Sequence, residues 1–281
     1  MRSLLAAVLM LSLPVFAQGP ASMVGVVAST SPKTAEDQAQ ALAGFVGSTL
    51  KGTARFRIFP NQEALAVALA NGDVDVALMG PLAWLRVPAG KGKLLVRTVR
   101  GGKSTYRSVL FSGPKSKFTS LAALKKSKAT LKVAWVETSS ASGYIVPKAM
   151  LLLNGINPVQ AFDTQDFLGS HDAVCKAVME GQYHVGATFS DPGVGSKVTG
   201  CEKALGREAA KLKVIALSEE VPNDVLAVSE KFGEGRAQAL ADAAKAASKE
   251  TLAAAFLADG VADVKDEDFT PIRKALDAFV P

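Results

Sequence analysis

The sequence gathers hydroxyl side chains at the start of one helical pattern. An apolar run ends at Val136, and the segment Thr138-Ser139-Ser140-Ala141-Ser142-Gly143 follows it. The first turn of a helix has unpaired backbone N–H groups and the positive end of the helix dipole. One Ser or Thr would suffice as an ordinary cap, and this segment has more. The surplus favours an oxyanion site as much as a plain helix start.

Two further helix starts could add donors to such a site. Gly80-Pro81 ends an apolar strand pattern, and Pro81 suits the first position of a helix. His171 follows Gly169-Ser170 in the first turn of another helical pattern, where its ring can donate to an anion. The simpler interpretations are a plain helix start at Gly80 and a surface histidine at position 171.

Catalytic patterns are weak in this sequence. Ser112 and Lys115 match Ser-x-x-Lys without a supporting motif, and no Gly precedes the serines as a nucleophile elbow requires. A triad of Ser142, His171 and Asp191 has no support from spacing. We therefore predict that the chain is not an enzyme. An exported hydrolase that uses Ser142 or Ser112 is the alternative.

Composition excludes several classes of protein. The chain has 281 residues, of which 48% are hydrophobic and 21% charged, so it is not disordered. Aromatic residues make up 6%, and no basic run exceeds Lys125-Lys126, so we predict no nucleic-acid partner. The formal charge of +6 fits a small anionic ligand or simple solubility.

Residues 1–17 resemble a secretory signal peptide. Arg2 is followed by an apolar stretch from Leu4 to Leu13, and Val15-Phe16-Ala17 suits cleavage after Ala17. The stretch is too short to span a membrane, and no Cys follows it to carry a lipid anchor. We therefore expect a periplasmic protein without a lipid anchor.

The two cysteines, Cys175 and Cys201, are predicted to form a disulfide, because an exported chain folds in an oxidising compartment. Closing that loop would contribute roughly 3.5 kcal/mol in the chain-entropy model. Two buried free thiols are the alternative. With only His171 and His184 and no Cys-x-x-Cys pair, we predict neither a metal nor another cofactor.

Strand and helix patterns alternate along the whole chain, which is typical of α/β proteins with mostly parallel sheets. The first helix is predicted over residues 36–50, with an apolar face of Ala39, Leu42, Ala43, Val46 and Leu50. Later predicted elements include a strand at 131–136, a helix at 143–154, a helix at 170–181 and a long helix at 234–258.

Two extended segments, residues 106–111 and 221–228, are predicted to connect two lobes. Residues 18–112 and 224–281 would form the first lobe, and residues 113–223 the second. Two lobes joined by two extended strands form a hinge with a cleft between them.

Several of these segments together resemble the phosphonate-binding proteins of bacterial ABC importers, within the wider phosphate, phosphite and phosphonate family. The resemblance runs from about Val24 to Phe279. The segments that carry it are Asp73-Val74-Asp75-Val76-Ala77, Gly80-Pro81, Tyr106-Arg107-Ser108-Val109, Ser140-Ala141-Ser142-Gly143-Tyr144, Gly169-Ser170-His171, Pro222-Asn223-Asp224 and Asp268-Phe269-Thr270-Pro271-Ile272-Arg273.

The resemblance implies a type II periplasmic-binding-protein fold with an anion site between its lobes. Ser140, Ala141 and Ser142 match the family's oxyanion turn, where the family has a hydroxyl at the position of Ala141. Tyr106 and His171 match its aromatic and histidine positions. Asp191 and Asp224 match carboxylates that hold an ammonium group in members that take aminoalkyl phosphonates. Gln62 stands where an aromatic residue is often found.

The resulting expectation is a monomeric solute-binding protein that serves an inner-membrane permease. A periplasmic sensor or adaptor with the same fold and a different small anion is the alternative. The sequence does not distinguish phosphonate, phosphite and phosphate as ligands.

Overall fold

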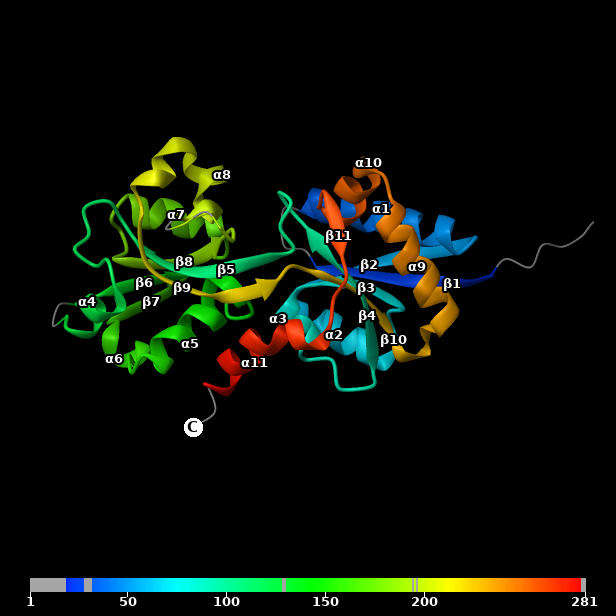
Figure 1. The fold of residues 1–281 in the computed structure, drawn as a ribbon, viewed down its shortest axis with the longest axis horizontal. Coiled ribbons are helices and arrows are strands. Elements are labelled where there is room, and N and C mark those ends of the chain that lie inside the picture. Colours follow the sequence, from blue (N-terminus) through cyan, green and yellow to red (C-terminus); the bar gives the residue numbers. More distant parts are fainter. Residues whose placement is uncertain (1–18, 28–31, 128–129, 194, 196, 279–281) are drawn as a thin grey trace, which may run out of the picture.

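The computed structural model describes residues 19–27, 32–127, 130–193, 195 and 197–278. The expected signal peptide, residues 1–17, lies outside these ranges. Figure 1 shows two lobes side by side, each with a central sheet and flanking helices. None of the described helices combines the length and apolar character needed to cross a membrane.

The first lobe contains a six-stranded sheet in the order β11-β4-β10-β3-β1-β2. Strand β1 pairs in parallel with β2 and β3, whereas β10 runs antiparallel to β3 and β4, and β11 antiparallel to β4. The strands are β1 (Gly19–Val27), β2 (Gly52–Phe59), β3 (Val76–Met79), β4 (Gly92–Val99), β10 (Val225–Ser229) and β11 (Gly260–Ala262).

The second lobe contains a five-stranded sheet in the order β7-β6-β8-β5-β9. Strand β6 is parallel to β7 and β8, and β5 is antiparallel to β8 and β9. The strands are β5 (Thr105–Ser112), β6 (Lys132–Trp135), β7 (Thr164–Phe167), β8 (Val185–Ser190) and β9 (Lys213–Pro222).

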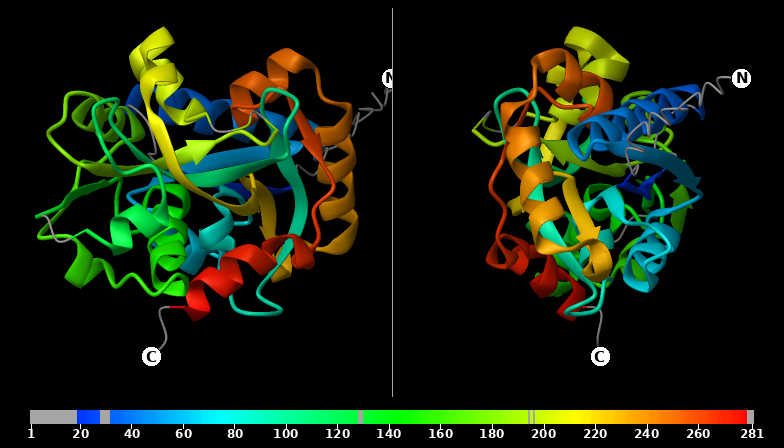
Figure 2. Two further views of the ribbon diagram at one scale, coloured as in Figure 1. Left: turned by 60° about the vertical axis from the view of Figure 1, so that its left-hand side comes forward. Right: turned by 90° about the vertical axis from the view of Figure 1, so that its right-hand side faces the viewer.

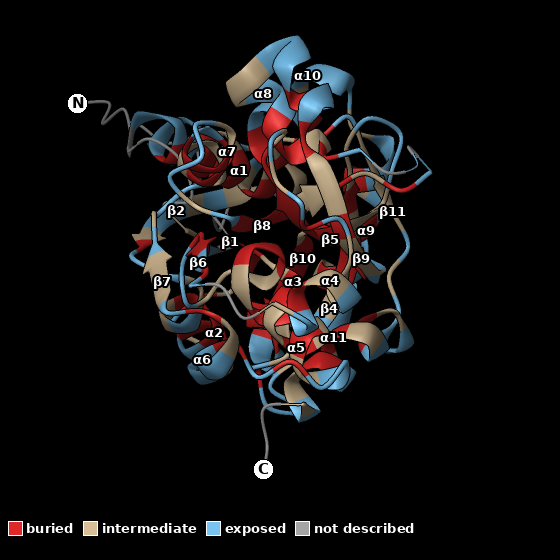
Figure 3. Cartoon of the chain, turned by 90° about the vertical axis from the view of Figure 1, so that its left-hand side faces the viewer, coloured by how far each residue is buried: buried red, intermediate tan, exposed pale blue. Residues whose placement is uncertain are grey.

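Helices cover the sheets and bury their apolar faces (Figure 3). The predicted apolar face of α1 is buried at Ala39, Leu42, Ala43 and Val46, and Leu50 packs against the same core. The α-helices are α1 (Pro32–Thr49), α2 (Gln62–Asn71), α3 (Pro81–Trp84), α4 (Leu121–Lys125), α5 (Val146–Leu153), α6 (Pro158–Ala161), α7 (His171–Met179), α8 (Glu202–Leu205), α9 (Glu234–Ala246), α10 (Lys249–Thr251) and α11 (Thr270–Asp277).

The two-lobe α/β fold is confirmed, with two corrections to its details. The sheets are mixed rather than mostly parallel, since each lobe receives strands that run back across the hinge. The predicted helix over 234–258 is broken, because the backbone of Ala247 is extended and Ser248 caps a new helix.

The chain crosses between the sheets twice, from β4 to β5 and from β9 to β10 (Figure 1). The second crossing is where the sequence places it, beside Asn223. The first comes earlier than predicted: β5, residues 105–112, is fully paired within the second sheet. The predicted boundary after residue 112 is therefore wrong, and the crossing lies at about residues 100–104.

A third contact joins the lobes through α11. This helix leaves the first lobe and lies alongside α5 of the second lobe (Figure 2). Ile272 and Ala275 of α11 are buried in one apolar cluster with Val146 and Ala149 of α5 and with Val221 at the end of β9. The lobes are thus held by two chain crossings and one helix–helix contact.

The structure pairs Cys175 of α7 with Cys201, with Cα atoms 5.4 Å apart. Both side chains are fully buried in the second lobe.

Candidate functional site

A cavity of about 320 Å³ lies between the two lobes. Every residue predicted to bind the ligand lines it: Gly80, Tyr106, Ser140, Ala141, Ser142, His171, Asp191 and Asp224. Gln62 also lines it, so the fold brings together residues up to 162 positions apart. Their roles in binding stay a prediction.

The hydroxyl-rich segment forms one wall of the cavity as a tight turn. After β6, Ser140 caps a five-residue π-helix, η1 (Ala141–Ile145), which continues directly into α5. The Ser140 hydroxyl accepts a hydrogen bond from the Gly143 N–H at 3.0 Å. Single π-turns of this kind are frequent at functional sites.

Gly143 makes this turn possible through its lack of a side chain. A Cβ atom there would lie 2.3 Å from Cγ2 of Val136 and 2.9 Å from Oγ of Ser140. The turn therefore packs directly on the end of the preceding strand. Only glycine permits that approach without moving the capping serine.

The turn leaves donors free at the cavity. Among the described residues, no partner accepts from the backbone N–H of Ala141 or Ser142, or from the Ser142 hydroxyl. Such groups at the first turn of a helix form a site for an anion. Ser139 contributes less, since its hydroxyl donates to Glu137 at 3.3 Å.

Ser108, which the sequence analysis did not assign, fixes the turn to the sheet. Its hydroxyl, fully buried on β5, donates to the backbone oxygen of Ser142 at 2.7 Å. The sequence offers one signal for it: Ser108 is a polar residue directly before the apolar run from Val109 to Phe111.

His171 begins α7 on the same side of the cavity, and Ser170 caps the helix. The Nδ1 atom of His171 is hydrogen-bonded to the Thr188 hydroxyl at 2.7 Å, and its ring meets Phe189 edge-on at 5.2 Å. Burial lowers the pKa of His171 to about 4, against a smaller opposing effect of Asp172. The ring is therefore neutral at pH 7, and Nε2 has no partner among the described residues.

Tyr106 stands at the first crossing, near the start of β5. Burial, and to a smaller extent the charge of Asp224, raise the pKa of its phenol. The hydroxyl thus stays protonated and can donate to an oxyanion from the hinge side of the cavity.

The two carboxylates expected to receive an ammonium group differ in their surroundings. Asp224 forms an ion pair with Arg100, with 2.6 Å between Oδ2 and NH2. Asp191 donates its N–H to the Thr199 hydroxyl at 2.9 Å, and its carboxylate has no partner in the described part of the chain. Of these two carboxylates, only that of Asp224 has an ion-pair partner among the described residues.

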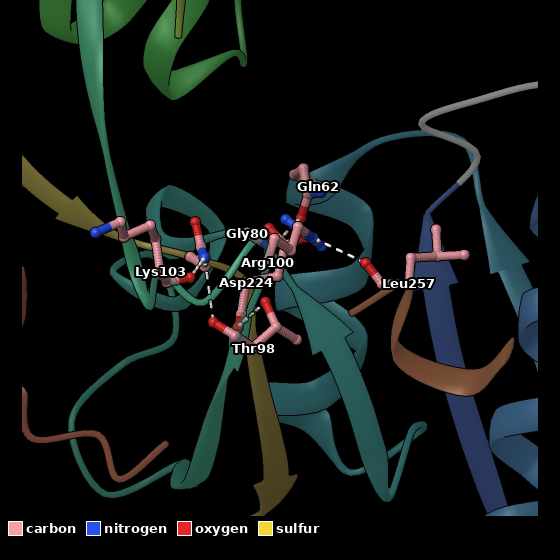
Figure 4. A network of polar contacts seen from close by, with 8 residues as sticks. Gln62, Gly80, Thr98, Arg100, Lys103, Asp224 and Leu257 are labelled. Atoms are coloured by element: carbon pink, nitrogen blue, oxygen red, sulfur yellow. Dashed lines mark hydrogen bonds and ion pairs between the residues drawn. The ribbon is translucent and has the colours of Figure 1, made fainter. Parts of the chain in front are cut away.

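Arg100, also unassigned from the sequence, joins the two crossings. Its Nε donates to the backbone oxygen of Leu257 at 3.0 Å (Figure 4). Asn223 donates from Nδ2 to the backbone oxygens of Thr98 and Lys103. An arginine directly before Gly101-Gly102, at the point where the chain leaves the sheet, is the sequence signal that marks it.

The corner at Gly80 contributes fewer donors than predicted. Its own N–H donates to Oε1 of Gln62 at 3.1 Å, and Pro81 has no N–H to offer. Gln62 thus ties α2 to the end of β3, and its Nε2 group has no hydrogen-bond partner among the described residues.

Comparison with known proteins identifies the family. The family model described as the periplasmic substrate-binding protein of phosphonate ABC transporters matches residues 24–269. The chain belongs to this family. Its members are substrate-binding components of transporters, which agrees with a two-lobe structure that has its cavity between the lobes.

Solved structures show the same fold. A binding-protein component of an ABC phosphonate transporter from Pseudomonas aeruginosa is 22% identical, with a TM-score of 0.70 over 92% of this chain and 85% of that one. PhnD1 from Prochlorococcus marinus, solved in complex with methylphosphonate, is 18% identical, with a TM-score of 0.71 over 92% and 99%. A Xanthomonas citri protein bound to ATP is 19% identical, with a TM-score of 0.74 over 92% and 96%.

Proposed function

We propose that this phosphonate-type binding protein holds a small phosphorus oxyanion, namely a phosphonate, phosphite or phosphate, in the cavity between its lobes. The observation that carries the proposal is the set of free donors at Ala141 and Ser142. The Tyr106 hydroxyl and the neutral ring of His171 line the same cavity. Donors from several elements can share the charge of the oxygens of such an anion.

A ligand that touches both lobes binds the closed arrangement better and shifts the protein toward it. An ABC permease in the inner membrane would then recognise the closed form. Transport is favoured over a sensor or adaptor role, because the family that matches the chain is that of transporter components. Binding and delivery need no catalytic base.

Recognition of an ammonium group, where the ligand carries one, is assigned to Asp191. Its carboxylate lines the cavity and has no cationic partner among the described residues, so it can accept from an ammonium group, whereas Arg100 neutralises Asp224. Asp191→Asn should weaken binding of 2-aminoethylphosphonate and spare methylphosphonate. Equal loss for both ligands would contradict this role.

We further propose that the protein is exported, cleaved after Ala17 and monomeric. N-terminal sequencing of the periplasmic protein and light scattering test these points. A mature chain that retains residues 1–17, or a stable dimer, would contradict them.

The main experiment is calorimetric titration with methylphosphonate, phosphite, phosphate and sulfate. Ser142→Asp places a carboxylate beside the free N–H groups. At about 4 Å and an effective dielectric near 20, the repulsion is about 4 kcal/mol before screening, so at least a hundredfold loss is expected. Ser142→Ala removes one hydrogen bond to a charged group, a loss of about 1.5–3 kcal/mol.

Ser48→Asp is the matched control, since Ser48 is exposed on α1 and takes no part in the cavity. It makes the same change in net charge and should leave affinity unaltered. Failure of all four ligands to bind, or binding to Ser142→Asp with wild-type affinity, would reject the assignment of the site.

A further inference from the structure

The first-lobe wall of the cavity carries a cation. Arg100 is the sole lysine or arginine among the described residues that line the cavity. Two of its five N–H groups are used, one by Asp224 and one by the Leu257 carbonyl, and no described residue accepts from the other three. The side chain is 41% exposed and lines the cavity.

The neighbours of Arg100 hold it in place. The Asp224 carboxylate accepts a hydrogen bond from Nη2 of Arg100. The backbone oxygen of Asp224 in turn accepts from the N–H and the hydroxyl of Thr98 at 2.8 and 3.2 Å. A guanidinium fixed in this way has its remaining donors pre-organised. It also keeps its charge, because Asp224 raises the pKa of Arg100.

Gln62 adds a second donor on the same wall, close to Arg100 in Figure 4. Its Oε1 accepts from the Gly80 N–H, which fixes the orientation of the amide. The Nε2 group of Gln62 is therefore the part of the amide that can donate to a ligand. This wall therefore offers planar N–H donors, the arrangement that suits a carboxylate.

The two walls of the cavity thus both present donors. The turn at Ala141 and Ser142 belongs to the second lobe, whereas Arg100 and Gln62 belong to the first. Apolar groups of Leu82, Ala83 and Phe189 also line the cavity. A ligand complementary to this surface has an oxyanion at each end and a short hydrocarbon chain between.

We propose that Arg100 is a specificity-determining residue, and that the ligand is a phosphonate whose organic group ends in a carboxylate. Building on the proposed function, the phosphonate end occupies the turn at Ser142. The carboxylate accepts from the free edge of Arg100 and from Nε2 of Gln62. A lone ammonium at the Arg100 end would meet a like charge, whereas Asp191, after β8 of the second lobe, is left to receive an ammonium carried elsewhere on the ligand.

The experiment compares three phosphonates of similar length by calorimetry: 3-phosphonopropionate, propylphosphonate and 2-aminoethylphosphonate. A charge-assisted contact to Arg100 should give 3-phosphonopropionate at least a tenfold lower Kd than propylphosphonate. Equal Kd values, or tightest binding of the amino ligand, would overturn the inference while leaving the proposed function intact. Failure of these phosphonates and of methylphosphonate to bind would overturn both.

Arg100→Gln should abolish the preference for the carboxylate, measured as the ratio of the Kd of propylphosphonate to that of 3-phosphonopropionate. Arg273→Gln is the matched control. Arg273 also pairs with a carboxylate, that of Asp266 at 2.8 Å, and is 42% exposed, yet it does not line the cavity. The control should keep the full preference.

Asp224→Asn provides a second test, in which the expected effect is the opposite of that in Arg100→Gln. This test does not depend on the folding of Arg100→Gln. The amide oxygen of Asn can still accept from Arg100 and keep the guanidinium in place, but it no longer neutralises the charge, so the preference for 3-phosphonopropionate should be kept or increased. Circular dichroism melting confirms that each variant is folded. Loss of the preference in folded Asp224→Asn would overturn the role of Arg100.

Discussion

The half-buried ring of His171 should make ligand binding and stability depend on pH in opposite directions. Burial among the elements of the second lobe holds the pKa of His171 at about 4. The hydrogen bond to Thr188 and the contact with Phe189 fix the ring at the cavity wall. The perturbation is a change of pH from 7.5 to 4.5, compared between the wild type and His171→Gln.

Stability of the unliganded protein should fall as the pH decreases. The folded-state pKa lies below the unfolded value of about 6.5, so the unfolded chain takes up the proton first. The contribution of the neutral ring is complete above pH 6.5 and is lost progressively down to about pH 4. The difference in pKa corresponds to about 3 kcal/mol, which His171→Gln should remove from the pH dependence.

Ligand affinity should instead increase as the pH decreases. An oxyanion about 4 Å from the ring interacts with a protonated imidazole by about 4 kcal/mol at an effective dielectric near 20. That energy is enough to return the pKa of His171 in the complex to its ordinary range. At pH values between the pKa of His171 in the free protein and that in the complex, binding of the ligand is coupled to uptake of a proton. In this range Kd falls by up to about tenfold for each unit by which the pH decreases.

The assay is the ratio of the Kd of His171→Gln to that of the wild type, measured by calorimetry across this pH range. The ratio cancels titration of the ligand itself. It should rise steadily below pH 6.5. His184→Gln is the control, because His184 is the other histidine and is exposed outside the cavity. A flat ratio for His171→Gln would refute the reasoning.

Three further predictions concern the second lobe. Replacing both Cys175 and Cys201 by Ala should lower the unfolding free energy by about 3.5 kcal/mol in urea titrations and leave Kd unchanged; two alkylatable thiols in the native protein would contradict the disulfide. Gly143→Ala should cost about 1–3 kcal/mol and weaken oxyanion binding, because the new Cβ displaces Val136 or Ser140. Gly44→Ala, whose Cβ would meet nothing within 4 Å, should show neither effect in the same melting and calorimetry experiments. Ala141→Ser supplies a further hydroxyl at the turn, and calorimetry should show about tenfold tighter binding of methylphosphonate; unchanged affinity would mean that this position does not face the oxyanion.

Features with local causes were predictable from the sequence. Helix α2, residues 62–71, is such a feature, because its start and end signals are local: the Asn61 side chain caps it by accepting from the Ala64 N–H, and Gly72 ends it in the left-handed conformation. The turn at Ser140 was predictable for the same reason, since a hydroxyl cap and a glycine lie within four residues.

Features that depend on distant partners were not predictable. Strand β4 was missed, since its short apolar run from Leu94 to Val96 is flanked by Lys93, Arg97 and Thr98 and its pairing partners lie far away at β10 and β11. Because β4 was not predicted, the first boundary between the lobes was placed after β5 and not before it. The ion pair between Arg100 and Asp224 joins residues 124 positions apart, so no local sequence pattern around either residue predicts it. From the sequence alone Asp224 is free to hold an ammonium, whereas the structure pairs its carboxylate with Arg100.

The turn at residues 141–145, the hinge and the contact between α11 and α5 form one connected structure. The turn at residues 141–145 leads without interruption into α5, whose Val146 and Ala149 pack on α11 of the first lobe. The same turn is bound through Ser142 to Ser108 on β5, the strand that follows the first crossing. A ligand bound as proposed, between this turn and Arg100, would therefore contact elements that lead to both connections. Because α5 and α11 are buried against each other, we expect closure to combine rotation at the β5 and β9 crossings with small sliding between these helices, as in hinge and shear motions.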